Sequence, residues 1–267
     1  MLRTEMRNEN TTHIDQMSAL EIAQVMNREN MNSVMAVEAA LPQVALAIEA
    51  AAKAIGNGGK MIYIGAGTSG RLGIQDAAEC PPTFGVEDWV VQGIIAGGKD
   101  RVFKAGENAE DFYENGVRDV ESLLKPGDVL VGISAAGGAQ YVVGALEAAK
   151  KIGCVTVALT SNADTAITKV ADIAIVCDTG AEAVTGSTRL KAGNSQKFVL
   201  NMLSTGAMIK TGKVYENLMI NLKPSNVKLK GRVVRITAAI LDCSEEEATA
   251  LLEKNDWNIR KTVEGAK

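Results

Sequence analysis

The chain has 267 residues and a mass of 28.1 kDa, which is enough for one large or two modest domains with a substantial core. Apolar residues make up 46% and charged residues 22% of the sequence, a composition that excludes a disordered or fibrous protein. The 28 basic and 32 acidic residues give a formal charge of -4. No basic run is long enough to neutralise a row of phosphates, which argues against a nucleic-acid partner.

Cysteine and histidine usage limits the possible metal and nucleophile chemistry. The four cysteines form no C-x-x-C pair and lie tens of residues apart, at Cys80, Cys154, Cys177 and Cys243, so a zinc site is not expected. The single histidine, His13, lies in a polar leader, where we expect a surface or interface position. The leader lacks the apolar core of a signal peptide, and glycines interrupt the longest uncharged stretch, residues 129–146. We therefore expect a cytoplasmic protein without a membrane partner.

The first fifth of the chain has a helical pattern. Ser18 and Glu21 have the spacing of a capping box, and apolar residues recur at intervals of three and four over residues 34–55. Residues 1–56 are therefore predicted to form a helical N-terminal arm.

Short apolar runs with little polar alternation then follow, as in strands covered on both faces of a parallel sheet. They span residues 61–64, 90–95, 129–133, 155–159 and 173–177. Helical patterns separate the first four, most clearly at 139–152, and the spacing allows right-handed crossovers. Residues 57–223 are predicted to form an α/β domain around a doubly wound, five-stranded parallel sheet.

The last part of the chain is helical by pattern. Residues 187–210 are predicted to form one long helix that hydroxyl residues cap and that packs on the sheet. Three shorter helices are predicted over residues 232–241, 245–254 and 258–265, the second begun by a capping box of Ser244 and Glu247. Residues 224–267 should therefore form a small helical module.

A glycine-rich loop, G-A-G-T-S-G-R-L-G from residue 65 to 73, follows the first predicted strand and opens a helix. It matches the dinucleotide pattern G-x-G-x-x-G, but the second strand is followed by A-G-G instead of an acidic residue for a ribose, which disfavours NAD. Gly67 lets the backbone approach an anion, and Thr68 and Ser69 add hydroxyl donors, which suits a phosphate monoester. The alternative is a glycine turn with capping hydroxyls and no ligand.

Two further hydroxyl-bearing loops are candidates for the same site. The loop after the third strand, S-A-A-G-G-A-Q, contributes Ser134 and Gly137, and the segment T-G-S-T at 185–188 contributes Ser187 and Thr188, with Lys191 close by. In a parallel sheet these loops converge beyond the carboxyl ends of the strands. The alternative is that all of them are ordinary helix caps.

Acidic residues are the candidates for proton transfer, because histidine is scarce. Glu79 lies between Ala78 and Cys80 and before two prolines, so we predict an apolar setting that would hold the carboxyl protonated; the alternative is a carboxylate that faces solvent. Glu110 lies in a predicted helical stretch, residues 104–124, together with further acids at Glu107, Asp111 and Glu114. Its local pattern does not single it out.

Taken together, these segments resemble the N-acetylmuramic acid 6-phosphate etherase family. The resemblance is carried by GAGTSGRLGIQDAAECPPTFG, IAGG, AED, TGSTRLKAG and GAMIKTGKVYENLM, and it extends over almost the whole chain. It implies a sugar isomerase (SIS) fold, a homodimer with sites near the subunit interface, a sugar phosphate as ligand, and no metal or organic cofactor. It also implies cytosolic recycling of cell-wall sugars, in which a lactyl ether is cleaved to N-acetylglucosamine 6-phosphate and D-lactate.

The resemblance assigns separate roles to the two glutamates. Glu79 would be the acid that protonates the departing lactate oxygen, and Glu110 the base that removes the hydrogen on carbon 2. The second loop departs from the family pattern, since SAAGGAQ replaces an expected SASGRTP and offers fewer side-chain contacts.

Other functions stay open at this point. An aldose-ketose isomerase would use the same fold and the same type of proton abstraction without releasing lactate. A non-catalytic sugar-phosphate sensor, as in the glucokinase regulatory protein, would bind the ligand unchanged. The helical tail, whose pattern is similar to ubiquitin-associated domains, is a possible docking module for another protein.

Overall fold

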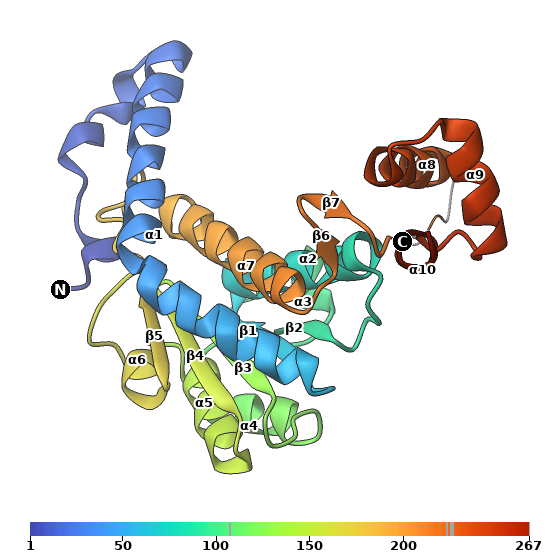
Figure 1. Ribbon diagram of the computed structural model, residues 1–267. Helices are drawn as coiled ribbons and strands as arrows, with labels where there is room; N and C mark the ends of the chain where they lie inside the picture. Colours follow the sequence, from blue (N-terminus) through green and yellow to red (C-terminus); the bar gives the residue numbers. More distant parts are fainter. Residues whose placement is uncertain (107, 223, 225–226, 267) are drawn as a thin grey trace. The chain divides into compact units, whose positions relative to one another are not determined.

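The computed structural model describes residues 1–106, 108–222, 224 and 227–266. These residues fall into two compact units (Figure 1). The first comprises Met1–Ala78 and Trp89–Ala207, and the second Glu79–Asp88 and Met208–Lys267. The helical arm thus belongs to the first unit, and the three-part division by residue number, with boundaries after residues 56 and 223, stays a prediction.

The centre of the first unit is a five-stranded parallel sheet, as predicted. Its strands are β1 (Met61–Gly65), β2 (Val91–Ile95), β3 (Val129–Ile133), β4 (Val155–Thr160) and β5 (Ile173–Val176), in the order β2-β1-β3-β4-β5. Every residue of β1 and β3 is buried, which explains why these strands are apolar without alternation. The chain passes from β1 to β2 on one side and then to β3 on the other, so the order reverses at β1.

Helices cover both faces of this sheet. On one face, the side chains of Ile62, Ile64 and Leu130 pack in a common core with residues of α4 (Tyr113–Glu121), α5 (Gln140–Ile152) and α6 (Ala166–Val170). On the other face, the Tyr63 hydroxyl donates to Asp76 of α2 (Gly67–Phe84), and Asn201 of α7 (Lys191–Lys210) donates to the same carboxylate at 2.6 Å. This shared acceptor fixes α2 and α7 on β1. The short α3 (Asp100–Phe103) follows β2.

The N-terminal arm consists of three short 3-10 turns, η1 (Arg3–Glu5), η2 (Glu9–Thr11) and η3 (Ile14–Gln16), and one long helix, α1 (Ala19–Gly56). The predicted capping box of Ser18 and Glu21 is present. By length and composition alone α1 is apolar enough to cross a membrane. Its inner face, however, is buried and contacts β1, β3 and β5, and this packing accounts for much of its apolar character (Figure 1).

The second unit contains the three predicted tail helices and a small hairpin. The helices are α8 (Val227–Leu241), α9 (Glu245–Lys254) and α10 (Ile259–Gly265), and the predicted capping box of Ser244 and Glu247 begins α9. Their buried apolar residues form a separate core. The hairpin of β6 (Val214–Tyr215) and β7 (Leu218–Met219) has strands of only two residues, too short for an apolar pattern to reveal.

Candidate functional site

The sheet brings the first two predicted loops together. Gly65 at the end of β1 pairs in register with Ile133 at the end of β3, so the loops that follow these strands leave the sheet side by side. This is the topological switch point, the place where open α/β sheets bind their ligands.

The first loop holds an uncovered helix N-terminus. Gly67 has a φ of +53°, and a Cβ on Gly70 would lie only 2.6 Å from the Gly65 carbonyl oxygen, so the loop depends on glycine. In the described part of the chain, no hydrogen bond uses the backbone N–H groups of Gly67, Thr68 or Ser69. Three amides at a helix N-terminus attract an anion through both hydrogen bonding and the helix dipole.

Ser69 is buried and has a partner that the sequence analysis missed. Its hydroxyl donates to Oε1 of Gln196, a buried residue of α7, at 3.0 Å. The start of α7 lies against the same loop, because a Cβ on Gly193 would lie 3.6 Å from Thr68 Cγ2 and 3.5 Å from the Thr188 carbonyl oxygen. The first loop and the segment containing Thr188 are therefore neighbours, as predicted from the parallel sheet.

The second loop is held by its own hydroxyl. The Oγ of Ser134 accepts a hydrogen bond from the N–H of Gly137 at 3.1 Å. Gly137 has a φ of +77°, and a Cβ there would collide with Thr165 at 2.4 Å. Both residues are buried. Their observed contacts keep the turn tight, and binding of a ligand by them stays a prediction.

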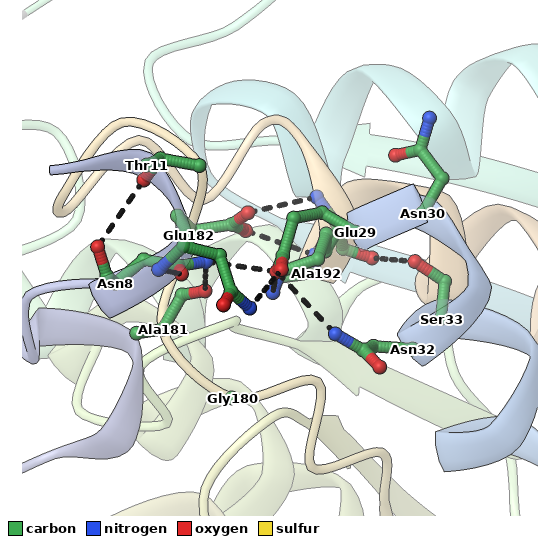
Figure 2. A network of polar contacts seen from close by, with 12 residues as sticks. Asn8, Thr11, Glu29, Asn30, Asn32, Ser33, Gly180, Ala181, Glu182 and Ala192 are labelled. Carbon is green, nitrogen blue, oxygen red and sulfur yellow. Dashed lines mark hydrogen bonds and ion pairs between the residues drawn. The ribbon is translucent and has the colours of Figure 1, made fainter. Parts of the chain in front are cut away.

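The third candidate site differs from the prediction. The helix α7 begins at Lys191 and not at Ser187, because residues 188–190 form a turn. The carboxylate of Glu182, which is fully buried, accepts hydrogen bonds from the N–H groups of Lys191 and Ala192, both at 3.0 Å. The prediction that hydroxyl residues cap this helix is therefore wrong: a carboxylate from the preceding loop already occupies its N-terminus (Figure 2).

Lys191 is also occupied within the chain. Its ammonium lies 2.5 Å from Oε2 of Glu29 on α1, and the two side chains are 2% and 6% exposed. Burial raises the pKa of Glu29, but hydrogen bonds from Lys191, Asn10 and Asn8 outweigh it and hold that pKa below its ordinary value. Figure 2 shows how this network joins the leader to α1 and to the start of α7. The charge of Lys191 is thus compensated by Glu29, which leaves the predicted contact to a phosphate without support.

Glu110 lies beside the second loop, although not on a helix as predicted. The helix α4 begins at Tyr113, and Asn108 with a φ of +64° interrupts the helical pattern before it. Glu107, counted with the acids of that stretch, lies outside the described residues. The carbonyl oxygen of Glu110 accepts a hydrogen bond from the N–H of Tyr141 at 2.9 Å. This bond fixes Glu110 at the first turn of α5, with its side chain exposed.

Glu79 is exposed, so the prediction of a buried carboxyl is wrong for this chain. In the second half of α2 the buried positions are Asp76, Ala77, Cys80 and Phe84, which share one helical face, and Glu79 lies off that face. The two prolines that follow it are accommodated within α2. Glu79 belongs to the second compact unit and Glu110 to the first.

Cysteine and histidine take positions that suit no nucleophilic role. Cys80, Cys154 and Cys177 are buried, and burial raises the pKa of the Cys177 thiol to about 12, far from the range of reactive thiols. His13 is exposed on the leader, as predicted.

Comparisons with known proteins agree with this fold and these motifs. The family model of the glucokinase regulatory protein N-terminal SIS domain matches residues 43–150. A phosphoheptose isomerase from Francisella tularensis superposes with a TM-score of 0.54 at 20% identity, over 72% of this chain and 98% of that one, which supports the SIS fold.

Two curated relatives match nearly the whole chain. The N-acetylmuramic acid 6-phosphate etherase of Symbiobacterium thermophilum is 47% identical over 262 residues, which cover 98% of this chain and 87% of the relative. That of Clostridium beijerinckii is 49% identical over 263 residues, which cover 98% and 86%. Identity at this level over almost the full length leads to one conclusion: this chain belongs to the N-acetylmuramic acid 6-phosphate etherase family.

Proposed function

We propose that this chain cleaves the lactyl ether of N-acetylmuramic acid 6-phosphate to N-acetylglucosamine 6-phosphate and D-lactate, in the cytoplasm, as a step of cell-wall sugar recycling. The observation that carries this proposal is the near full-length identity to relatives with that name. The three uncovered amides of the first loop support it, because they offer a site for the phosphate.

The reaction requires two proton transfers at different atoms of one sugar. Ring opening exposes an aldehyde, which acidifies the hydrogen on carbon 2, and its removal as a proton expels lactate from carbon 3. Water then adds to the unsaturated aldehyde to give the product. Because an alkoxide is a poor leaving group, the ether oxygen has to be protonated as the bond breaks. Each positioned transfer contributes about 100- to 10,000-fold to the rate.

We assign the base to Glu110 and the acid to Glu79. The side chain of Glu110 is exposed beside the second loop, where a carboxylate can accept the proton from carbon 2. Glu79 is exposed in the single chain, whereas general acids of this kind work in settings that are covered from water. We therefore propose that substrate or a second subunit covers Glu79 in the working enzyme.

A homodimer fits the surface of α1. Six of its large apolar side chains are 42–68% exposed: Leu20, Met31, Val34, Met35, Leu41 and Leu46. An apolar surface of this extent is typical of a protein interface. Light scattering of Met31→Glu combined with Met35→Glu should show a monomer that has lost lactate release, whereas a fully active monomer would overturn the dimer requirement.

The decisive assay measures D-lactate after incubation of the purified protein with N-acetylmuramic acid 6-phosphate. Lactate release supports the proposal, and its absence over a range of pH overturns it. Binding of the substrate without turnover would indicate a sugar-phosphate sensor instead. Formation of a ketose without lactate would indicate an isomerase.

Hydrogen exchange in heavy water distinguishes the proposed roles of the two glutamates. Glu79→Gln should abolish lactate release while the hydrogen on carbon 2 still exchanges, because the base remains. Glu110→Gln should abolish both. The opposite pattern would reverse the roles, and normal lactate release by both variants would place the catalytic pair elsewhere. The exposed Glu121 at the end of α4 offers a matched control, Glu121→Gln, which should behave as the wild type.

A further inference from the structure

The buried amide of Gln196 has a nitrogen that the fold does not use. Gln196 is 1% exposed, and its Nε2 has no hydrogen-bond partner among the described residues. Buried polar atoms in native structures are almost always hydrogen-bonded, because a buried atom without a partner loses its hydrogen bonds to water and gains none in return. An orphaned donor of this kind therefore points to a ligand that is absent from the isolated chain.

The number of unused hydrogens in the Ser69–Gln196 pair is the same for both orientations of the Gln196 amide. As it stands, Ser69 donates to Oε1 of Gln196 at 3.0 Å, and both hydrogens of Nε2 remain unused. With the amide turned by 180°, Nε2 would donate to Ser69 Oγ, and the Ser69 hydroxyl hydrogen would be released in its place. In either arrangement the pair retains two hydrogens for another acceptor.

This pair lies at the first loop. Ser69 is in the first turn of α2, whose amides at Gly67, Thr68 and Ser69 are also unused. Gln196 is one turn beyond Gly193 on α7, and Gly193 lies close to Thr68, since a Cβ there would be in van der Waals contact with Thr68 Cγ2 at 3.6 Å. Two helices thus direct unused donors toward one place: α2 by its N-terminus and α7 by the side chain of Gln196.

The charge around the loop strengthens this reading. Lys191, the cation predicted for the phosphate, is buried against Glu29. An anion at the first loop would therefore not be held by Lys191, and the neutral donors there have to be several, because each is weaker than a bond from a cation.

We propose that Gln196 is a ligand-binding residue of the first loop, where it acts with Ser69 to donate hydrogen bonds to a phosphate oxygen of the sugar phosphate. This rests on the proposed function only for the identity of the sugar. The phosphate itself is recognised by the donors of Gln196, Ser69 and the first turn of α2.

The test is calorimetric titration with N-acetylglucosamine 6-phosphate, with inorganic phosphate as a second probe. Gln196→Met keeps the length of the side chain and removes the orphaned donor, so the fold should be as stable as the wild type or more so. Its affinity for both probes should fall about tenfold or more, and KM should rise in parallel. Glu121→Met, an exposed change at the end of α4, should leave both affinities unchanged.

A second variant and a double variant keep the test decisive. Gln196→Glu retains an acceptor for Ser69 but places a negative charge at the site, so it should weaken both probes more than Gln196→Met does. If Ser69 and Gln196 act as one unit, Ser69→Ala combined with Gln196→Met should bind little worse than either single variant. Affinities within twofold of the wild type for folded Gln196→Met, or for Gln196→Glu if the first does not fold, would overturn the proposal.

Its failure can be told apart from failure of the proposed function. Lactate release by the wild type, with normal phosphate affinity in the Gln196 variants, would reject the role of Gln196 and leave the etherase activity in place. Phosphate binding that depends on Gln196, without any lactate release by the wild type, would reject the etherase activity and leave the role of Gln196 in place.

Discussion

Two helix N-termini of this molecule have similar sequences, but their first backbone N–H groups differ in whether they have a hydrogen-bond acceptor. The helix α2 begins with a glycine and two hydroxyl residues, G-T-S at 67–69, and a similar run, G-S-T at 186–188, precedes α7. The first amides of α2 have no acceptor among the described residues, whereas those of α7 bind the buried carboxylate of Glu182. A glycine with hydroxyl neighbours thus indicates that a helix begins, but it does not tell whether the end of that helix is free for a ligand.

The difference lies in what the rest of the chain brings to each end. At α7, Glu182 fills the amides and Glu29 neutralises Lys191, so the helix start is a closed structural joint between the leader, α1 and α7 (Figure 2). At α2, the side chain that bonds to the first turn among the described residues is Gln196, which is neutral and itself has an unused donor. One end is closed by side chains of the chain itself, and the other keeps unused donors among the described residues.

The largest effect should come from breaking the charge pair at the α7 end. Lys191→Met leaves Glu29 buried without its cation, and removal of one partner of a buried ion pair costs about 3–5 kcal/mol. The free energy of unfolding from urea denaturation measures this loss. Lys197→Met, an exposed change on the same helix, should stay within about 0.5 kcal/mol of the wild type. Equal stability of the two variants would show that the joint contributes nothing.

Glu182→Gln should have the next largest effect. The amide keeps one acceptor oxygen but loses the charge and presents N–H groups to the N–H groups of α7. Hydrogen bonds to charged groups are worth about 1.5–3 kcal/mol each, so we expect a loss of that size in urea denaturation. Glu38→Gln, exposed on α1, is the matched control. An unchanged free energy of unfolding would mean that the carboxylate is not what closes this end.

Local sequence patterns predicted the strands and two helix caps of this structure. Apolar runs gave the five strands to within two residues, because a strand covered on both faces leaves no position for polar residues. The capping boxes at Ser18 and Ser244 were found because both partners lie within one turn. Local spacing therefore predicted the elements and placed the first loop at the end of β1.

The closure of α7 could not be found in this way, because its partners are distant in sequence. Lys191 and Glu29 are 162 positions apart, and Ser69 and Gln196 are 127 apart. One local signal for Gln196 was available. It is the polar member of a stripe with Ala192, Val199 and Leu203, all of them buried, and a polar residue in a buried stripe requires a partner.

Truncation of a hydroxyl side chain should raise KM at the start of α2 and leave it nearly unchanged at the start of α7. Ser69→Ala removes a donor from the open end and should raise KM about tenfold, since a lost bond to a charged group of roughly 1.4 kcal/mol corresponds to that factor. Thr188→Ala, at the closed end, should change KM by less than about twofold. Lactate release at varied substrate concentration gives both values. A larger effect at Thr188 than at Ser69 would reverse the assignment of the open and closed ends.

The smallest effect should be a difference in the response to acid. Hydrogen bonds hold the pKa of Glu29 below its ordinary value, despite its burial, so its ionised form stabilises the folded state. A depressed pKa contributes stability that is complete above the unfolded value, about 4.3 for a glutamate, and is lost as the pH falls through the lower folded value. The Tm of the wild type should therefore fall more steeply below about pH 4.3 than that of Glu29→Gln, and the two should run in parallel from pH 5 to 7 because Glu29 stays ionised there. Since Glu29 bonds to Lys191 and not to the first loop, Ser69→Ala should keep the wild-type slope. Parallel curves for the wild type and Glu29→Gln down to pH 3 would show that the charge of Glu29 does not stabilise the α7 end.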